Sequence, residues 1–231
     1  MNYLQLVNTA RVECGVSGPA LTTVQGLTPG GESARMANWV NQAWMDVQTA
    51  KEDWQWLREP VQFNLVTQQQ EYTPAQAGVG STFGNWKRDS FRCSSVGQNY
   101  ADEQLLNYMD YTTFRNLYQY GNMRTTYARP VVVSIAPGGP DKNLAFGSIP
   151  DQPYVITAEY YKKPVELEAD ADEPQIPSRF HMIIVYRAMM YYGGYEAAPE
   201  VFARGEQEFK RLMNRLDIDQ LPTPVSGPPL A

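Results

Sequence analysis

The chain has 231 residues, which exceeds the usual domain length of about 100 to 150, with 43% hydrophobic and 19% charged residues. This balance is ordinary for a globular protein, and no stretch reaches the roughly 18 consecutive apolar residues of a membrane-spanning helix. Nineteen basic against 25 acidic residues give a net charge of -6, which argues against tight nucleic-acid binding, because phosphate recognition requires a basic surface.

A short helix is predicted at the start of the chain. Leu4, Val7 and Cys14 recur at helical spacing, and Gly15 follows where a helix commonly ends in a left-handed residue. Residues 16–31 are rich in glycine and proline and predict a loop.

The longest predicted helix covers residues 32–57. Its apolar residues step by three and four positions and trace one face: Met36, Val40, Ala43, Val47, Ala50, Trp54 and Leu57. Glu32 lies near its start, where a carboxylate complements exposed amides, and Pro60 is expected to end it.

Residues 61–97 predict strands around a glycine-bearing loop, because Val61, Phe63 and Leu65 alternate with polar residues. A helix is predicted over residues 110–120. Asp110 is expected to cap it, with the following apolar residues facing inward: Phe114, Leu117 and Tyr118.

Three further segments, 130–135, 143–146 and 154–161, are rich in branched and aromatic residues and predict a three-stranded antiparallel meander. The acidic residues 166–173 that follow are interpreted as a solvated connector.

Two helices are predicted near the end of the chain. The first begins at Pro177 and ends near Gly193, and the second runs from Pro199 to Asp219. Residues 222–231 contain four prolines and predict an extended arm, because proline neither continues a helix nor enters a central strand.

These elements predict an α+β fold, a bundle of four to five helices with an inserted antiparallel β meander and an extended C-terminal arm. The expected domain comprises residues 1–221. Its predicted parts are a helical core, 1–59, 108–121 and 177–219, and a β-rich insertion, about 61–165.

No residue pattern specifies a reaction, so an enzyme is not predicted, and no catalytic residue, metal ligand or cofactor is assigned. His181 is the only histidine and predicts a structural role on a helix face. Cys14 and Cys93 belong to no CxxC pair and fit a reduced cytosol. The glycine clusters near residues 78–84 and 138–140 lack the P-loop pattern, and the acidic run 170–173 lacks a calcium-loop pattern.

Several motifs occur in an order that is moderately specific. They are Gly31-Glu32-Ser33-Ala34-Arg35-Met36-Ala37-Asn38-Trp39-Val40-Asn41-Gln42-Ala43-Trp44, Trp54-Gln55-Trp56, Ala128-Arg129-Pro130, Pro153-Tyr154, Glu159-Tyr160-Tyr161, Ile176-Pro177 after Pro174, Arg187-Ala188-Met189-Met190 after Phe180, and Ala197-Ala198-Pro199-Glu200. Together they resemble the head-to-tail adaptor proteins of tailed double-stranded DNA bacteriophages. The resemblance covers nearly the whole chain.

The resemblance implies a structural protein of the virion neck, a ring subunit, commonly one of twelve copies, assembled in the host cytoplasm. Its implied partners are further copies of itself, the portal protein, a downstream neck or tail protein, and duplex DNA that passes through without sequence-specific binding. It implies no cofactor, no catalytic residue and no membrane partner. Alternatives are a stopper or terminator of the neck, a non-viral interaction domain, and a hydrolase with dispersed carboxylates.

Two sets of residues are expected to matter for this role. Contacts with the portal or a neighbouring subunit are predicted for the arm and the residue before it: Leu221, Pro222, Pro224, Val225, Pro228, Pro229 and Leu230. Core packing is predicted for five aromatic residues: Trp39, Trp44, Trp54, Tyr186 and Phe209.

Overall fold

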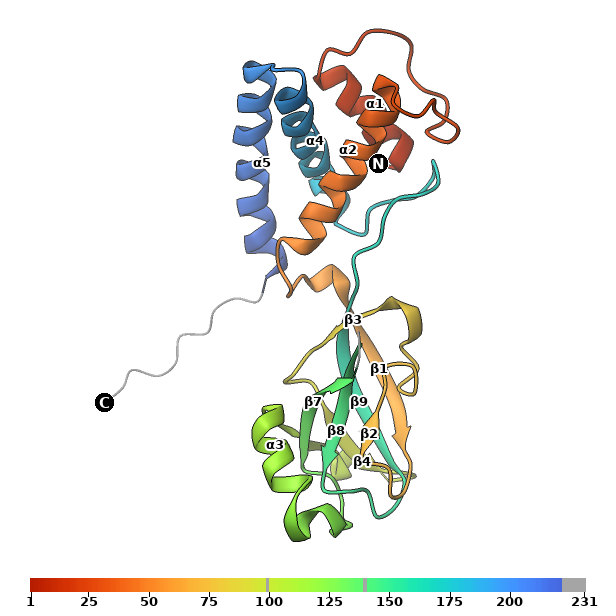
Figure 1. Cartoon of the computed structure of the whole chain (residues 1–231), viewed down its shortest axis with the longest axis vertical. Helices are drawn as coiled ribbons and strands as arrows, with labels where there is room; N and C mark the ends of the chain where they lie inside the picture. Colours follow the sequence, from red (N-terminus) through yellow and green to blue (C-terminus); the bar gives the residue numbers. More distant parts are fainter. Residues whose placement is uncertain (99, 139–140, 222–231) are drawn as a thin grey trace, which may run out of the picture. The chain divides into compact units, whose positions relative to one another are not determined.

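The computed structural model describes residues 1–98, 100–138 and 141–221. The chain divides into two compact units (Figure 1): a helical unit, formed by residues 1–56 together with the chain from residue 164 onward, and a β unit, Leu57–Lys163. The α+β class predicted from the sequence is confirmed.

In its described residues, the helical unit contains four α-helices: α1 (Tyr3–Glu13), α2 (Glu32–Thr49), α4 (Met182–Tyr195) and α5 (Pro199–Gln220). Helix α4 packs against the other three, and a short turn reverses the chain into α5, which runs alongside it (Figure 1). The central position of α4 follows from its sequence, because apolar side chains surround it on several sides. Those buried include Ile183, Ile184, Val185, Ala188 and Met189.

Helix α1 matches its prediction, and Gly15 has a φ of 72° just beyond its end. Helix α2 is shorter than predicted, because it ends at Thr49. The indole Nε1 of Trp54 donates to the carbonyl oxygen of Val47 at 3.0 Å, an oxygen that the next helical turn would otherwise engage. Trp54 is therefore buried because the chain folds back on the end of α2. Its spacing from Val47 and Ala50 matches that of a helix, which explains why the predicted helix was too long.

Two sheets form the β unit. The first contains β1 (Arg58–Leu65), β3 (Phe83–Trp86), β4 (Arg92–Ser95), β5 (Gln104–Leu105) and β9 (Tyr154–Lys162). The second contains β2 (Glu71–Tyr72), β6 (Asn107–Tyr108), β7 (Val132–Gly138) and β8 (Asp141–Gly147). The core cluster of the unit draws on both sheets and includes Phe63, Tyr72, Trp86, Phe146 and Ile156.

Strand β9 lies at the centre of the first sheet. The prediction that it is the third strand of a meander with β7 and β8 is therefore wrong. Strands β7 and β8 pair antiparallel as expected, but β9 pairs with β1 along one edge and with β3 and β4 along the other. The physical reason is that the second edge of β8 is already occupied by β2. Among the described strands β1 pairs with β9 alone, and this edge position tolerates Pro60.

Helix α3 (Tyr111–Tyr118) is the helix predicted over residues 110–120, and its cap is confirmed, since Thr113 N–H donates to Asp110 Oδ1 at 3.0 Å. It belongs to the β unit, however, and not to the helical core as predicted for residues 108–121. The reason is that Phe114 is fully buried in a cluster with residues of β7 and β8. Leu117, predicted to face inward, is 50% exposed.

Helix α5 follows its predicted span closely, whereas α4 begins later than the predicted start at Pro177. Helix α4 begins at Met182 after a short 3-10 turn and continues through the glycine pair to Tyr195. Helix α5 begins at Pro199 as predicted and ends one residue after Asp219. In the described part of the chain, no helix combines the length and apolar character needed to cross a membrane.

Candidate functional site

An acidic segment lies along α2 and is held there by side-chain amides. We define residues 165–173 as the acidic strap. Val165 N–H donates to Gln48 Oε1 at 3.0 Å, and Gln48 Nε2 donates back to the Val165 carbonyl at 3.0 Å. Leu167 N–H donates to Asn41 Oδ1 at 2.9 Å. Asn41 and Gln48 are two helical turns apart on the same face of α2, so they fix the direction of the strap.

A tight turn closes the strap. The Asp172 carboxylate accepts from the N–H groups of Glu168 at 2.8 Å and Ala169 at 2.7 Å, and these bonds hold its pKa below the ordinary value. Tyr3 N–H donates to the Asp172 carbonyl at 2.8 Å, and Val24 N–H donates to Asp170 Oδ1 at 2.8 Å. The solvated connector predicted over residues 166–173 is thus corrected: hydrogen bonds tie it to α1, α2 and the loop between them.

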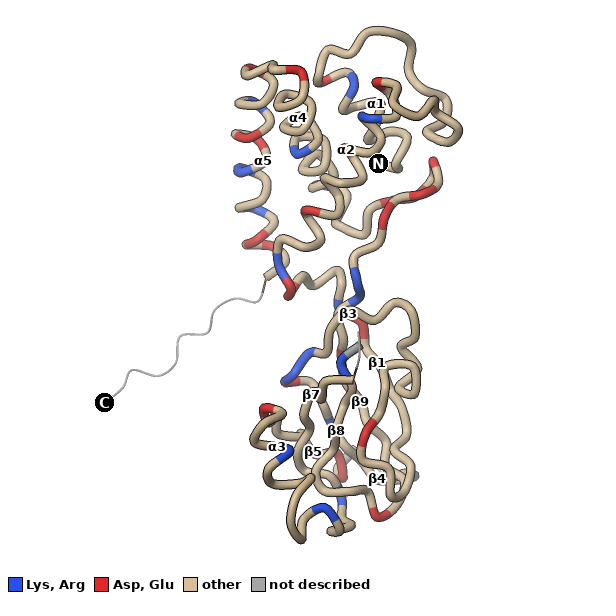
Figure 2. Tube along the Cα trace, in the orientation of Figure 1, with Lys and Arg blue, Asp and Glu red and all other residues tan. Residues whose placement is uncertain are grey.

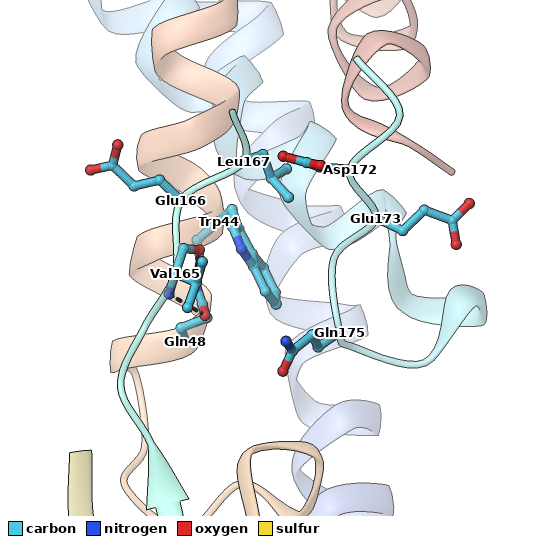
Figure 3. A pocket seen from close by; sticks show the side chains of 8 residues that line it. All are labelled: Trp44, Gln48, Val165, Glu166, Leu167, Asp172, Glu173 and Gln175. Atoms are coloured by element: carbon cyan, nitrogen blue, oxygen red, sulfur yellow. Dashed lines mark hydrogen bonds between the residues drawn. The ribbon is translucent and has the colours of Figure 1, made fainter. Parts of the chain in front are cut away.

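A pocket of about 250 Å³ opens between the strap and α2 (Figure 3). The indole of Trp44 forms its inner wall and is only 2% exposed. Figure 3 shows the carboxylates of Glu166 and Glu173 pointing away from this wall on opposite sides. The two carboxylates therefore lie outside the pocket, where they can meet basic side chains of a protein partner.

The strap carries negative charge that the described residues leave uncompensated. Figure 2 shows its acidic positions following one another along the trace. Glu166, Glu168 and Glu173 are exposed, and within residues 1–98, 100–138 and 141–221 none of them forms an ion pair. Burial and the nearby Glu166 and Asp170 together raise the pKa of Tyr3 to about 12.

A second apolar surface lies at the end of α5. Phe180, Leu212 and Ile218 line a shallow pocket of about 560 Å³ together with charged side chains, and Ile218 is 85% exposed. Leu221 follows in extended conformation, with φ -96° and ψ 152°. An exposed isoleucine in the last turn of α5 marks a surface that a partner or the chain itself can cover.

Comparison with known protein families decides the class of this chain. A family model described as SU10 adaptor protein matches residues 1–228, which includes both compact units. The chain belongs to the SU10 adaptor protein family. This is a family of phage head-tail adaptors, structural proteins of the virion, so the resemblance stated from the sequence is confirmed. No curated protein matches the chain.

The five aromatic residues predicted for core packing all lie in the helical unit of this adaptor, with different degrees of burial. Trp44 and Trp54 are buried, at 2% and 0% exposed. Trp39, Tyr186 and Phe209 are half-buried. Trp39 meets the ring of Tyr192 edge-on at 6.1 Å, and the Arg187 guanidinium lies 5.7 Å from the Phe209 ring centroid.

Of the residues predicted to contact the portal or a neighbouring subunit, the structure places Leu221 at the end of α5, half-buried. The others lie outside the described residues: Pro222, Pro224, Val225, Pro228, Pro229 and Leu230.

The residues that the sequence singled out for possible chemistry have structural surroundings in the adaptor. His181 is 3% exposed; its Nε2 lies 3.1 Å from the Ile176 carbonyl and its Nδ1 lies 2.6 Å from the Met1 amine, and burial lowers its pKa. Cys14 and Cys93 are buried and unbridged, and burial raises the pKa of Cys14 to about 12. Among the residues with described positions, no group of His, Cys, Asp or Glu could hold a metal ion.

Sequence reasoning missed the strap, because charge runs are usually solvated. The available signal was the pair of amide residues, Asn41 and Gln48, spaced by seven on the otherwise apolar side of a helix. A buried amide needs hydrogen-bond partners, and a neighbouring extended segment is the usual source of backbone groups.

Proposed function

We propose that this adaptor is a subunit of a homo-oligomeric ring, of twelve copies, that docks on the portal and joins the DNA-filled head to the tail. The observation that carries the proposal is the family match over residues 1–228. This match extends over both compact units, whereas one shared motif would cover only a short segment. Further partners in this proposal are a downstream neck or tail protein and DNA within the channel. Assembly takes place in the host cytoplasm.

The charge balance supports a channel that DNA passes without being held. The net charge of -6 repels phosphates on average, so contacts with the DNA backbone stay weak. A protein that binds DNA tightly would instead need a continuous basic surface.

The C-terminal arm, residues 222–231, is the part that we assign to portal or subunit contact. In support, an extended Leu221 follows the end of α5 at Gln220, and Ile218 in the last turn of α5 is exposed. Fixing a free chain costs about 1 to 2 kcal/mol per residue, so the arm gains from binding only where a groove covers its apolar residues. These are Val225 and Leu230, with Leu221 just before the arm, and the intervening prolines lower the cost by restricting the unbound chain.

Deleting residues 222–231 tests this assignment. The truncated protein is expected to keep the thermal unfolding temperature of the full chain and to lose binding to purified portal rings, followed by negative-stain electron microscopy and native mass spectrometry. A matched pair of variants isolates the apolar residues: Leu221→Ser/Val225→Ser/Leu230→Ser should behave like the deletion, whereas Thr223→Ala/Ser226→Ala should bind normally. Normal portal binding by the deleted protein would refute the role of the arm.

A further inference from the structure

The β unit presents an apolar and aromatic surface on and after α3. We call residues 115–124 the α3 surface. It includes the end of α3 and all but the last residue of a short 3-10 helix, Gly121–Thr125. Three large side chains are exposed there: Leu117 at 50%, Tyr120 at 57% and Met123 at 41%. Tyrosine, methionine and arginine are enriched in protein interfaces, whereas isolated exposed side chains are scattered over a typical surface.

Two arginines give this surface positive charge. Arg115 and Arg124 are both exposed, and neither forms an ion pair with any residue that the structure describes. The Arg115 guanidinium lies 5.9 Å from the centroid of the Tyr120 ring, which keeps it close to the apolar side chains. Its fork of N–H donors remains available to carboxylates.

The two units of the chain differ in charge. The helical unit has 16 acidic and 9 basic residues, a net charge of -7, whereas the β unit has 9 acidic and 10 basic residues, a net charge of +1. The overall negative charge therefore belongs to the helical unit. In that unit, the acidic strap has exposed carboxylates that form no ion pair with described residues. Its first residue, Val165, is 50% exposed.

We infer that the α3 surface of one copy binds the acidic strap of a second copy. The α3 surface combines exposed apolar side chains with unpaired positive charge, and the strap combines the exposed Val165 with unpaired negative charge. Like charges meet if either surface pairs with itself, so the complementary pairing is the favoured one. This inference rests on the proposed ring, and it adds which surfaces join the subunits.

The contact joins two different surfaces, so in a bound pair one copy keeps a free strap and the other keeps a free α3 surface. Such a heterologous contact continues from copy to copy and closes into a ring when the rotation per step divides a full turn. Because the charges lie on exposed side chains, the contact should weaken as salt shortens the range of electrostatic attraction.

Charge reversal of each surface tests the inference in the full chain. One variant is Arg115→Glu/Arg124→Glu and the other is Glu166→Lys/Glu168→Lys. Each alone should weaken self-association by about tenfold or more, because like charges then face each other. An equimolar mixture of the two should recover the wild-type level, since every contact in an alternating assembly is again between opposite charges. The matched control for the strap variant is Glu52→Lys/Asp53→Lys. It changes the net charge by the same amount, and it replaces two exposed acidic residues elsewhere in the helical unit.

Sedimentation velocity over a concentration series, with circular dichroism to verify folding, provides the measurement. Recovery in the mixture, with the control unaffected, is the expected result. If wild-type rings form and both reversals leave them unchanged, these surfaces do not join the copies, although the proposed ring stands. If the wild-type protein stays monomeric even when portal rings are added, the proposed function itself fails. Binding of a short DNA duplex that is lost in the arginine variant, with self-association unchanged, would assign the α3 surface to DNA and overturn the inference.

Discussion

Individual side chains, more than regular hydrogen-bond ladders, organise the acidic strap. Gln48 substitutes for a strand partner, since its side-chain amide makes the two hydrogen bonds that a neighbouring backbone would offer to Val165. Asp172 plays the corresponding part at the turn, where its carboxylate accepts from two backbone N–H groups. Removing either side chain would leave backbone groups to find other partners, which is usually costly when they are shielded from water.

The lowered pKa of Asp172 predicts how its contribution depends on pH. In the folded protein its pKa lies below the ordinary 3.8, so the folded state binds fewer protons than the unfolded state around that pH. The stabilisation is complete above the ordinary pKa and is lost as pH falls through the folded one. Asp172→Ala should therefore lower Tm near neutral pH, and its difference from the wild type should shrink on acidification.

The control for this prediction is Glu173→Ala, which removes an exposed neighbouring charge in the same strap. Thermal unfolding followed by circular dichroism, from about pH 7 to about pH 2, should show a pH-dependent loss for Asp172→Ala and little change for Glu173→Ala. Equal losses in both variants would mean that net charge, and not the turn, is responsible.

At the scale of elements, the close approach of α4 and α5 depends on a small residue. A Cβ added at Gly205 of α5 would lie 2.9 Å from the Tyr186 carbonyl oxygen of α4, whereas one added at Gly194 of α4 would meet nothing within 4 Å. Both glycines are in helices, where alanine is intrinsically preferred. Their different surroundings therefore predict opposite effects of the same substitution.

Gly205→Ala should destabilise the protein by about 1 to 3 kcal/mol, because the added methyl group forces the helices apart. Gly194→Ala should stabilise it by about 0.5 to 1 kcal/mol, because it removes only the conformational freedom of an unfolded glycine. Urea unfolding monitored by circular dichroism measures both changes. Stabilisation by both substitutions would contradict the close packing of α4 on α5.

The elements also show what local pattern could and could not predict. Helix α5 was predicted to within one residue, and the Asp110 cap was predicted because capping depends on residues close in sequence. The end of α2 was wrong because Trp54 satisfies helical spacing while folding back on Val47. The predictions for the partners of β9 and for the position of α3 were wrong. Both features depend on contacts between distant parts of the chain, and the periodicity of apolar residues carries no information on such contacts.

For the whole molecule, the functional class followed from the order of weak motifs along the chain, whereas the interaction surfaces did not. The strap and the α3 surface become visible only when the fold shows which charges have no partner. Two compact units with net charges of -7 and +1 suit a protein whose copies bind through unlike surfaces.

Cryo-electron microscopy of the purified protein, alone and mixed with portal rings, tests the proposed adaptor role most directly. The expected result is a ring of this protein stacked coaxially on the portal, with a continuous channel and with density from residues 222–231 at the portal or at a neighbouring copy. A monodisperse monomer that ignores the portal under conditions where portal rings are intact would contradict it.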